Sequence, residues 1–254
     1  MTDDHQLARE LADLAGERLL AVRTELHAAG VEGRELKDAG DAASQEVLAA
    51  ALAERAPGDA VLSEEAADDH ARLSADRVWI IDPLDGTREF SEVPRDDWAV
   101  HVALWQGGDL VAGAVALPAR GVTYGTDVQG DGIPARPEGE PPLRLAVSRS
   151  RPPAFAEELG RTMGATTVPM GSAGVKAMSV VDGSSDAYVH AGGQYEWDSA
   201  APVAVAQAYG LHTSRVDGSP LVYNKENPWS PDLVVCRPEV AEELLAALAT
   251  MDLG

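Results

Sequence analysis

Apolar residues near the start of the chain recur at the three- and four-residue steps that place them on one face of a helix. Leu7, Leu11 and Leu26 belong to this series, which predicts a helix over about residues 3–29. A second helix is expected over about residues 42–55 and should end at the turn-forming residues that follow. The chain is therefore expected to open with two helices.

Short apolar runs bounded by charged or turn residues follow these helices and predict strands. The run at 78–81 is apolar at every position, which is typical of a strand buried on both faces. Further strands are expected at 60–62, 98–105 and 110–117, and the Gly-Gly turn between the last two favours a hairpin.

In the second half of the chain, strand-like segments alternate with helical segments, which favours an α/β layered domain. Residues 127–142 are rich in Gly, Pro, Asp and Glu and are the best candidate for a long loop or a domain boundary. We therefore expect an α+β domain over 1–142 and an α/β domain over 143–254. The predicted strands of the second half are 143–147, 165–168, 187–189 and 232–236, and its helices are 153–163, 174–181, 197–209 and 238–251.

The charge balance restricts the partners of this protein. Lys and Arg total 20 against 42 for Asp and Glu, which gives a formal net charge of -22. A negative field of this size repels nucleic acid polymers and anionic membranes, so we expect neither as a partner. A small anionic substrate would need local cations, either metal ions or a few placed basic side chains.

Cysteine content and hydropathy exclude further classes of protein. Cys236 is the single cysteine, which excludes an intramolecular disulfide and a zinc cluster built from cysteines. No run approaches the roughly 18 apolar residues of a membrane span, and the first residues lack the pattern of a secretory signal. We expect a cytoplasmic protein.

The acidic segment Asp82–Thr87, with sequence Asp-Pro-Leu-Asp-Gly-Thr, directly follows the buried run. Two carboxylates at a strand end repel each other unless a cation lies between them. Mg²⁺ accepts carboxylate, carbonyl and water oxygens, so Asp82, the Leu84 carbonyl and Asp85 could share one or two ions. Read alone, the same segment also fits a simple hairpin turn.

The end of this segment has the features of a phosphate-binding turn. Gly86 permits a close backbone approach, and Thr87 offers a hydroxyl group beside the acids. If a helix begins there, the backbone N–H groups of both residues could face a phosphate.

Other acids extend the candidate site, although each has an ordinary explanation. Glu64 and Glu65 follow a short strand, and Glu65 fits a solvated neighbour better than a second ligand. Asp198 lies at the start of a predicted helix and Asp41 precedes another, and an Asp in such a place serves as an N-cap as readily as a ligand.

Together these segments resemble the inositol monophosphatase superfamily of lithium-sensitive, magnesium-dependent phosphatases. The pattern of that superfamily is a Glu-Glu pair, then Asp-Pro-(Leu/Ile)-Asp-Gly-Thr, then a distant Trp-Asp before an Ala-rich helix. Here these are Glu64-Glu65, Asp82–Thr87 and Trp197-Asp198, in the same order. The resemblance implies a layered αβαβα fold of the sugar-phosphatase type.

The resemblance also implies roles for the acids. Asp41 and Thr87 would position the attacking water, and Glu64 would take part in catalysis beside two or three Mg²⁺ ions. The implied metal ligands are Glu64, Asp82, the Leu84 carbonyl, Asp85 and Asp198.

Within the superfamily, Thr87–Phe90, Asp97–Val100 and Gly171–Lys176 look closer to the 3′(2′),5′-bisphosphate nucleotidase branch. That branch implies hydrolysis of the 3′-phosphate of 3′-phosphoadenosine 5′-phosphate to AMP. Inositol monophosphatase, fructose-1,6-bisphosphatase and histidinol-phosphatase activities are the alternatives. Dimers are frequent in the superfamily, so the resemblance allows a homodimer, while the sequence itself does not settle the oligomeric state.

The implied substrate contacts carry competing explanations. Lys176 could reach a phosphate or extend to solvent, and Arg88 could bind a second phosphate or form a salt bridge. Ser172 could contact a nucleotide or cap a helix. His101 and His190 are expected to be packed or surface residues. The full set of expected substrate contacts is Gly86, Thr87, Arg88, Gly171, Ser172, Lys176, Glu196 and Asp198.

Two rival classes remain open. Haloacid dehalogenase phosphatases carry Asp-x-Asp-Gly-Thr after a buried strand, but the spacing here is one residue longer. A metal- or nucleotide-binding protein without turnover is the second rival, and binding without phosphate release would identify it.

Overall fold

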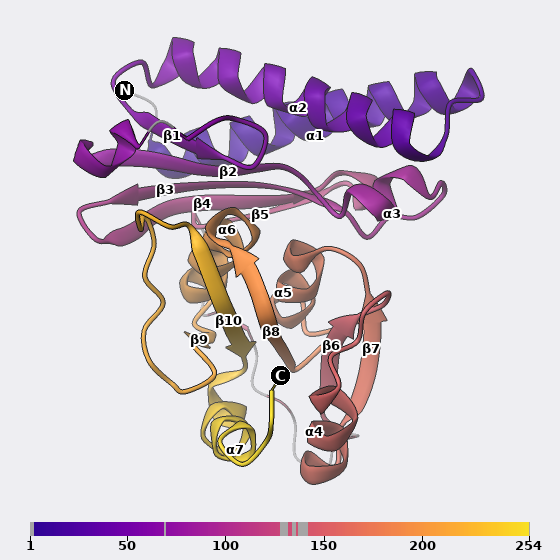
Figure 1. Ribbon diagram of the computed structural model, residues 1–254, viewed down its shortest axis with the longest axis vertical. Coiled ribbons are helices and arrows are strands. Elements are labelled where there is room, and N and C mark those ends of the chain that lie inside the picture. The colour runs from indigo at the N-terminus through magenta and orange to yellow at the C-terminus, as the bar shows by residue number, and fades with distance from the viewer. Residues whose placement is uncertain (1–2, 69, 128–131, 134–135, 137–141, 254) are drawn as a thin grey trace.

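The computed structural model describes residues 3–68, 70–127, 132–133, 136 and 142–253. Helices and sheets alternate in five layers, with two helices, a sheet, two helices, a second sheet and two helices in succession (Figure 1). This is the αβαβα arrangement that the sequence predicts.

The first two layers come from the N-terminal half. Helices α1 (Asp4–Ala28) and α2 (Gly33–Arg55) cover a five-stranded sheet of order β1-β2-β3-β4-β5. Strand β1 is parallel to β2, and the other pairs are antiparallel. The strands are β1 (Ala60–Ser63), β2 (Arg77–Asp85), β3 (Ala99–Gln106), β4 (Asp109–Leu117) and β5 (Val122–Gly125).

The C-terminal half supplies a second five-stranded sheet of order β7-β6-β8-β10-β9. Strand β6 is parallel to both of its neighbours, whereas β10 is antiparallel to β8 and β9. Helices α4 (Phe155–Met163) and α7 (Pro238–Leu248) pack on its outer face (Figure 1). The strands are β6 (Arg144–Ser148), β7 (Thr166–Met170), β8 (Ala187–Tyr195), β9 (His212–Ser214) and β10 (Trp229–Cys236).

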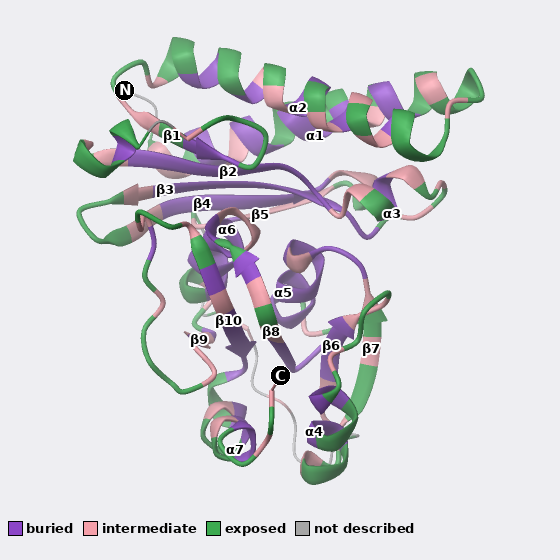
Figure 2. Ribbon diagram, in the orientation of Figure 1, coloured by how far each residue is buried: buried purple, intermediate pink, exposed green. Residues whose placement is uncertain are grey.

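Helices α5 (Ala173–Val181) and α6 (Glu196–Ala208) fill the layer between the two sheets. They are buried around most of their circumference because a sheet lies on each side, as Figure 2 shows. The apolar cluster around them includes Leu62 and Val115 of the first half and Val175 and Leu233 of the second. The functional site lies at the first turns of these two helices.

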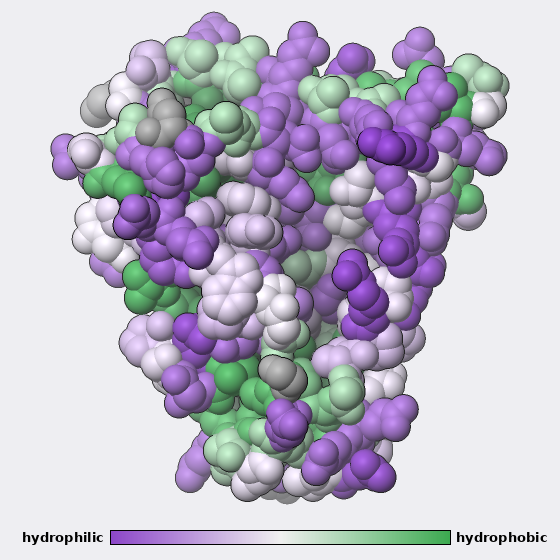
Figure 3. All heavy atoms as spheres, viewed as in Figure 1, coloured by the Kyte–Doolittle hydropathy of each residue, from purple (hydrophilic) through white to green (hydrophobic). Residues whose placement is uncertain are grey.

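On the face shown in Figure 3, hydrophilic side chains dominate the layer of α1 and α2. This agrees with the charged, exposed outer faces of both helices. Among the described residues, none of the helices has both the length and the apolar character needed to span a membrane.

Helix α2 begins at Gly33, nine residues before the predicted start, so Asp41 lies inside the helix rather than before it. The apolar periodicity is sparse in this first part, where Leu36 is fully buried between exposed charged residues. Gly40 also belongs to the buried face, because a Cβ there would lie 2.6 Å from the Phe90 ring.

Other differences concern the ends of elements. Strand β2 continues through Asp85, and β8 continues to Tyr195 beyond the predicted end at residue 189. Strand β9 was not predicted, because three residues carry too little pattern. Most of the expected boundary at 127–142 lies outside the described residues, so the two-domain division stays a prediction.

The layer of α1 can be tested by comparing two leucines of one helix. Leu11 is fully buried, whereas Leu14 is 42% exposed. Leu11→Ala should lower the free energy of unfolding by about 2–5 kcal/mol, because it leaves a cavity in a packed core. Leu14→Ala should change it by about 0.5 kcal/mol or less. Urea unfolding measures both, and equal losses would contradict the described packing.

Candidate metal centre and active site

Three carboxylates from the two halves of the chain meet at the ends of β2 and α6. Asp82, Asp85 and Asp198 each offer an oxygen, and these oxygens lie within 4.8 Å of one another. Residues three apart in a regular strand point to opposite faces. In β2, however, Asp82 pairs with His101 and Asp85 with Ala99, so β2 has one more residue than β3 across this interval. Such an irregularity bends the strand and brings both carboxylates to the same side.

Asp82 is fully buried and only half satisfied by the protein. Its Oδ1 accepts the Leu84 backbone N–H at 3.0 Å, whereas Oδ2 has no hydrogen-bond partner among the described residues. Burial, followed by repulsion from Asp85, Glu64 and Asp198, raises the pKa of Asp82 well above its usual value. A buried carboxylate oxygen without a partner is costly unless a cation binds it. The residues present therefore fit a bound metal ion.

Asp85 is held as an anion by several donors. Its Oδ2 accepts hydrogen bonds from the Ser172 hydroxyl and from the Gly174 N–H at 2.7 Å, and lies 3.2 Å from His101 Nε2. Burial acts to raise its pKa, but His101, Lys176 and Ser172 together hold the pKa of Asp85 below its usual value. Gly174 is required here, because a Cβ would lie 2.1 Å from His101 Nε2.

Asp198 occupies the first turn of α6, which begins at Glu196, one residue before the predicted start at 197. Its Oδ2 accepts the Tyr195 backbone N–H at 2.6 Å, so it does satisfy a donor at the start of the helix. Burial, followed by repulsion from Asp85, raises the pKa of Asp198 to about 6. This carboxylate is therefore both a helix-terminal acceptor and a member of the acidic cluster.

The other expected acids lie around this cluster. Glu64 is exposed as a whole residue, yet burial of its carboxyl group and repulsion from Asp198 and Asp85 raise its pKa to about 7. Asp41 is half-buried on α2, and burial followed by repulsion from Glu65 raises its pKa to about 7 as well. Two carboxyl groups beside the cluster can thus exchange protons near neutral pH.

The turn after Asp85 has the expected geometry. Gly86 has a φ of +84° and caps α3 (Thr87–Ser91), so a short helix does begin at Thr87. The Thr87 hydroxyl donates to the Leu84 carbonyl at 3.2 Å, which places both groups beside the acids. Arg88 is exposed and forms no ion pair with any residue that the structure describes, so its expected salt bridge is not found.

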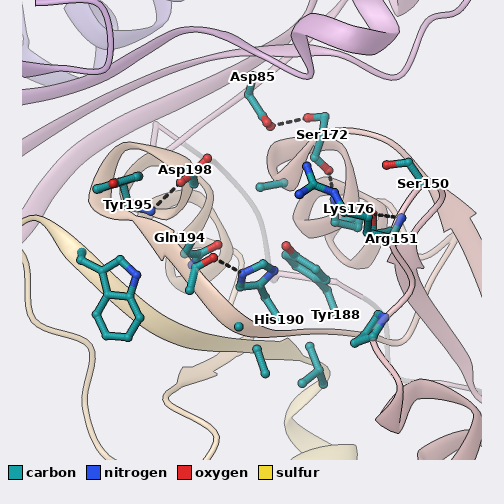
Figure 4. A pocket seen from close by; sticks show the side chains of 18 residues that line it. Asp85, Ser150, Arg151, Ser172, Lys176, Tyr188, His190, Gln194, Tyr195 and Asp198 are labelled. Atoms are coloured by element: carbon teal, nitrogen blue, oxygen red, sulfur yellow. Dashed lines mark hydrogen bonds between the residues drawn. The ribbon is translucent and has the colours of Figure 1, made fainter. Parts of the chain in front are cut away.

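A cavity of about 580 Å³ opens beside the carboxylates, between the first turns of α5 and α6 and strand β8 (Figure 4). Asp85 and Asp198 are among the residues that line it. Its wall includes Ser172, Lys176, Tyr188, His190, Gln194, Tyr195, Ser150, Arg151 and Trp229. The cavity size is typical of a small-molecule site.

Lys176 lines this cavity and does not extend to solvent. It is only 7% exposed, its Nζ donates to the Ser172 carbonyl at 2.5 Å, and it lies 5.2 Å above the Tyr188 ring. Burial lowers the pKa of Lys176. Ser172 is indeed a helix cap, since its hydroxyl accepts the Val175 N–H at 3.0 Å, but the same hydroxyl also reaches Asp85.

Gly171 and Glu196 are not among the cavity-lining residues. The Gly171 N–H donates to Asp97 at 2.7 Å. Glu196 is fully buried and accepts the N–H groups of Asn224 at 2.6 Å and Lys225 at 3.0 Å. Their direct contact with substrate stays a prediction, while the structure gives Glu196 the task of holding the 224–225 turn.

The histidines differ from each other. His101 is packed, as expected, but it also touches Asp85 and the Trp197 carbonyl, a link that the sequence analysis missed. The sequence did carry a signal for this link, because His101 is a polar residue within the otherwise apolar part of strand β3. His190 lines the cavity with Nε2 2.9 Å from the Gly193 carbonyl, and burial lowers its pKa.

Arg72 is a further residue whose structural role the sequence does not indicate. It is 1% exposed and donates to Asp68 at 2.7 Å and to the Asn224 side chain at 2.7 Å. It thus ties the segment after Glu64 to the turn that Glu196 holds.

The αβαβα layers and the acidic cluster together form the arrangement expected of a metal-dependent phosphatase. The model of the inositol monophosphatase family matches residues 2–251, and the chain belongs to this family. Membership also removes the haloacid dehalogenase alternative.

Relatives place the chain more narrowly. It is 55% identical over 243 residues to a 3′-phosphoadenosine 5′-phosphate phosphatase of Mycobacterium tuberculosis, covering 92% of this chain and 89% of the relative. It is 33% identical over 197 residues to the 3′(2′),5′-bisphosphate nucleotidase CysQ of Escherichia coli, covering 73% and 78%. The solved structure of CysQ from Bacteroides thetaiotaomicron is 25% identical, with a TM-score of 0.73 over 92% of this chain and 96% of that one.

The raised pKa values generate a pH prediction for the protein in EDTA. The carboxyl groups of Asp198 and Glu64 keep their protons up to about pH 6 and about pH 7 when folded, but lose them near their ordinary values of 3.8 and 4.5 when unfolded. Between these limits the folded state binds more protons, so stability should fall as pH rises. Urea unfolding at pH 5, 6 and 7 measures this slope. Asp198→Asn should flatten it, and an unchanged slope would contradict the electrostatic description.

Proposed function

We propose that this protein is a Mg²⁺-dependent phosphatase that hydrolyses the 3′-phosphate of 3′-phosphoadenosine 5′-phosphate to give AMP and phosphate. The observation that carries the proposal is the buried Asp82 Oδ2, which accepts no hydrogen bond from the described residues, within an acidic cluster beside a cavity of about 580 Å³. The substrate is supported by relatives of that name at 55% identity.

We assign Asp82, Asp85 and Asp198 as the central metal ligands, completed by Glu64 and the Leu84 carbonyl. All of these are hard oxygen donors, which suit Mg²⁺. When bound, two such ions would supply Lewis acidity toward the phosphate and lower the pKa of the attacking water. Asp85 is already anionic and fixed by Ser172 and Gly174, so it offers a charge whose position does not depend on the metal.

Asp41, Glu64 and Thr87 are the groups that we assign to water activation. The carboxyl group of Asp41 has a pKa raised to about 7, so it can accept a proton from water near neutral pH. Glu64 would take part by holding a metal ion that lowers the pKa of this water. The Thr87 hydroxyl donates to the Leu84 carbonyl, which leaves its oxygen lone pairs to accept a proton from water and orient it.

Basic groups on the cavity wall balance the charge of the substrate in a protein of net charge -22. Lys176 is buried beside Asp85, where low solvent exposure strengthens its attraction for a phosphate. Arg151 is exposed at the cavity and is a candidate for the second phosphate. Arg88 on α3, the candidate from the sequence, is not among the residues that line the cavity. A cytoplasmic location and a homodimer remain predictions.

A phosphate-release panel tests the proposal. The substrates are 3′-phosphoadenosine 5′-phosphate, inositol 1-phosphate, fructose 1,6-bisphosphate and histidinol phosphate, each with Mg²⁺, with added Li⁺ and with EDTA. We expect the highest kcat/KM for the bisphosphate nucleotide, inhibition by Li⁺ and no turnover in EDTA. Asp82→Asn is the matched variant and should lose at least about 100-fold in kcat, since an amide replaces a charged ligand.

Two outcomes of this panel would overturn the proposal. A higher kcat/KM for any of the other three esters would change the substrate assignment. Full turnover in EDTA, or full activity of Asp82→Asn, would remove the metal assignment.

A further inference from the structure

Two exposed aromatic residues stand at the cavity and have no task in the chemistry described above. Trp229 is 45% exposed and Tyr195 is 46% exposed, and both line the cavity that contains Asp85 and Asp198. Among the large hydrophobic residues exposed in the described part of the chain, they are the two aromatic ones. Exposed aromatic surface beside a polar site is typical of ligand contact.

The two side chains share one face of the second sheet. Trp229 of β10 lies directly opposite Tyr195 of β8 in the antiparallel pair. Opposite residues project to the same face, with Cα atoms roughly 4.5–5.5 Å apart. The Tyr195 backbone N–H donates to Asp198 at 2.6 Å, so Tyr195 is hydrogen-bonded directly to a member of the acidic cluster.

Local contacts hold the Trp229 indole in place. A Cβ on Gly193 would lie 2.6 Å from Trp229 Nε1 and 3.0 Å from Cε2, so the ring lies directly against this glycine, which has a φ of +91°. The backbone of Trp229 is fixed as well, because its carbonyl accepts Lys225 Nζ at 2.5 Å and its backbone N–H donates to Asn227 Oδ1 at 3.1 Å. The contact with Gly193 and this fixed backbone restrict the positions that the indole can take, which lowers the entropic cost of binding.

Tyr195 is supported in a similar way. Its ring stacks on Trp197 with centroids 4.7 Å apart and planes at 11°. Figure 4 shows Tyr195 beside Asp198 at one end of the cavity and Lys176 with Arg151 at the other. The cavity thus combines aromatic surface, carboxylates for metal and basic groups for phosphate.

We propose that Trp229 and Tyr195 form a stacking wall for the purine base, and that Trp229 is a specificity-determining residue for nucleotide over base-free phosphate esters. The proposal rests on the proposed function, because the metal cluster fixes where the scissile phosphate lies. Every nucleobase presents a flat π-face that stacks on an aromatic ring, whereas inositol phosphate and sugar phosphates offer none.

The test compares Trp229→Ala and Trp229→Phe with the wild-type protein. Steady-state rates with 3′-phosphoadenosine 5′-phosphate and with inositol 1-phosphate are measured in Mg²⁺, and AMP binding is measured by calorimetry. Loss of base stacking should raise KM for the nucleotide and Kd for AMP by about 10-fold or more, with a smaller change in kcat. Trp229→Phe keeps a ring and should stay within about 3-fold of wild type.

A control variant is available in the segment between β9 and β10. Val222 is 63% exposed and does not line the cavity, so Val222→Ala should leave all of these constants unchanged. The rate with inositol 1-phosphate should also be the same in Trp229→Ala and wild type.

The outcomes separate this inference from the proposed function. If the wild-type protein hydrolyses the nucleotide but Trp229→Ala retains its KM and its AMP affinity, the stacking wall is wrong and the phosphatase assignment stands. An equal loss toward both substrates would also overturn the wall, because it would indicate distortion of the shared site. If the wild type hydrolyses only base-free esters, the proposed function is wrong. If the wild type also fails to bind AMP, the proposed stacking of a base on Trp229 and Tyr195 is wrong as well.

Discussion

Repulsion among three crowded carboxylates is the constraint on which the rest of this structure depends. Asp82, Asp85 and Asp198 bring oxygens within 4.8 Å of one another, and the first two of these residues are buried. Burial and mutual repulsion raise the pKa values of Asp82 and Asp198, so without a cation these groups resist ionisation. Such an arrangement is unfavourable for stability and favourable for binding divalent metal, because a cation removes the repulsion.

The fold makes this arrangement possible by bringing carboxylates together from two neighbouring layers. An irregularity in β2 presents Asp82 and Asp85 on one side, and α6 supplies Asp198 from the layer below. The Gly174 N–H of α5 donates to Asp85 and the His101 ring lies beside it, which keeps Asp85 ionised, so one charge is permanent while the others depend on the cation. The central helices α5 and α6 are buried between the two sheets, and this packing holds the end of β2 close to the first turn of α6 at the site.

The sequence predicts the layers well because continuous apolar runs and helical periodicity are local signals, and most element bounds differ from the prediction by a few residues. The predictions from the sequence fail where tertiary contacts determine the position of a residue. Asp41 lies inside a helix whose first turns carry little apolar pattern. Lys176 turns to a buried carbonyl, and His101 reaches Asp85 across a strand, neither of which spacing reveals. Trp229 becomes a cavity wall only through its register with β8. Family resemblance names the acids, but not the side chains that orient them.

The central claim is that the acidic cluster binds divalent cations as the reactive centre. The most direct measurement is a crystal structure of the protein in Mn²⁺, with anomalous diffraction used to locate the ions. The account predicts an anomalous peak bonded to the free Oδ2 of Asp82 and shared with Asp85 or Asp198. A protein that is active in Mn²⁺ but shows no anomalous peak at these carboxylates would contradict it.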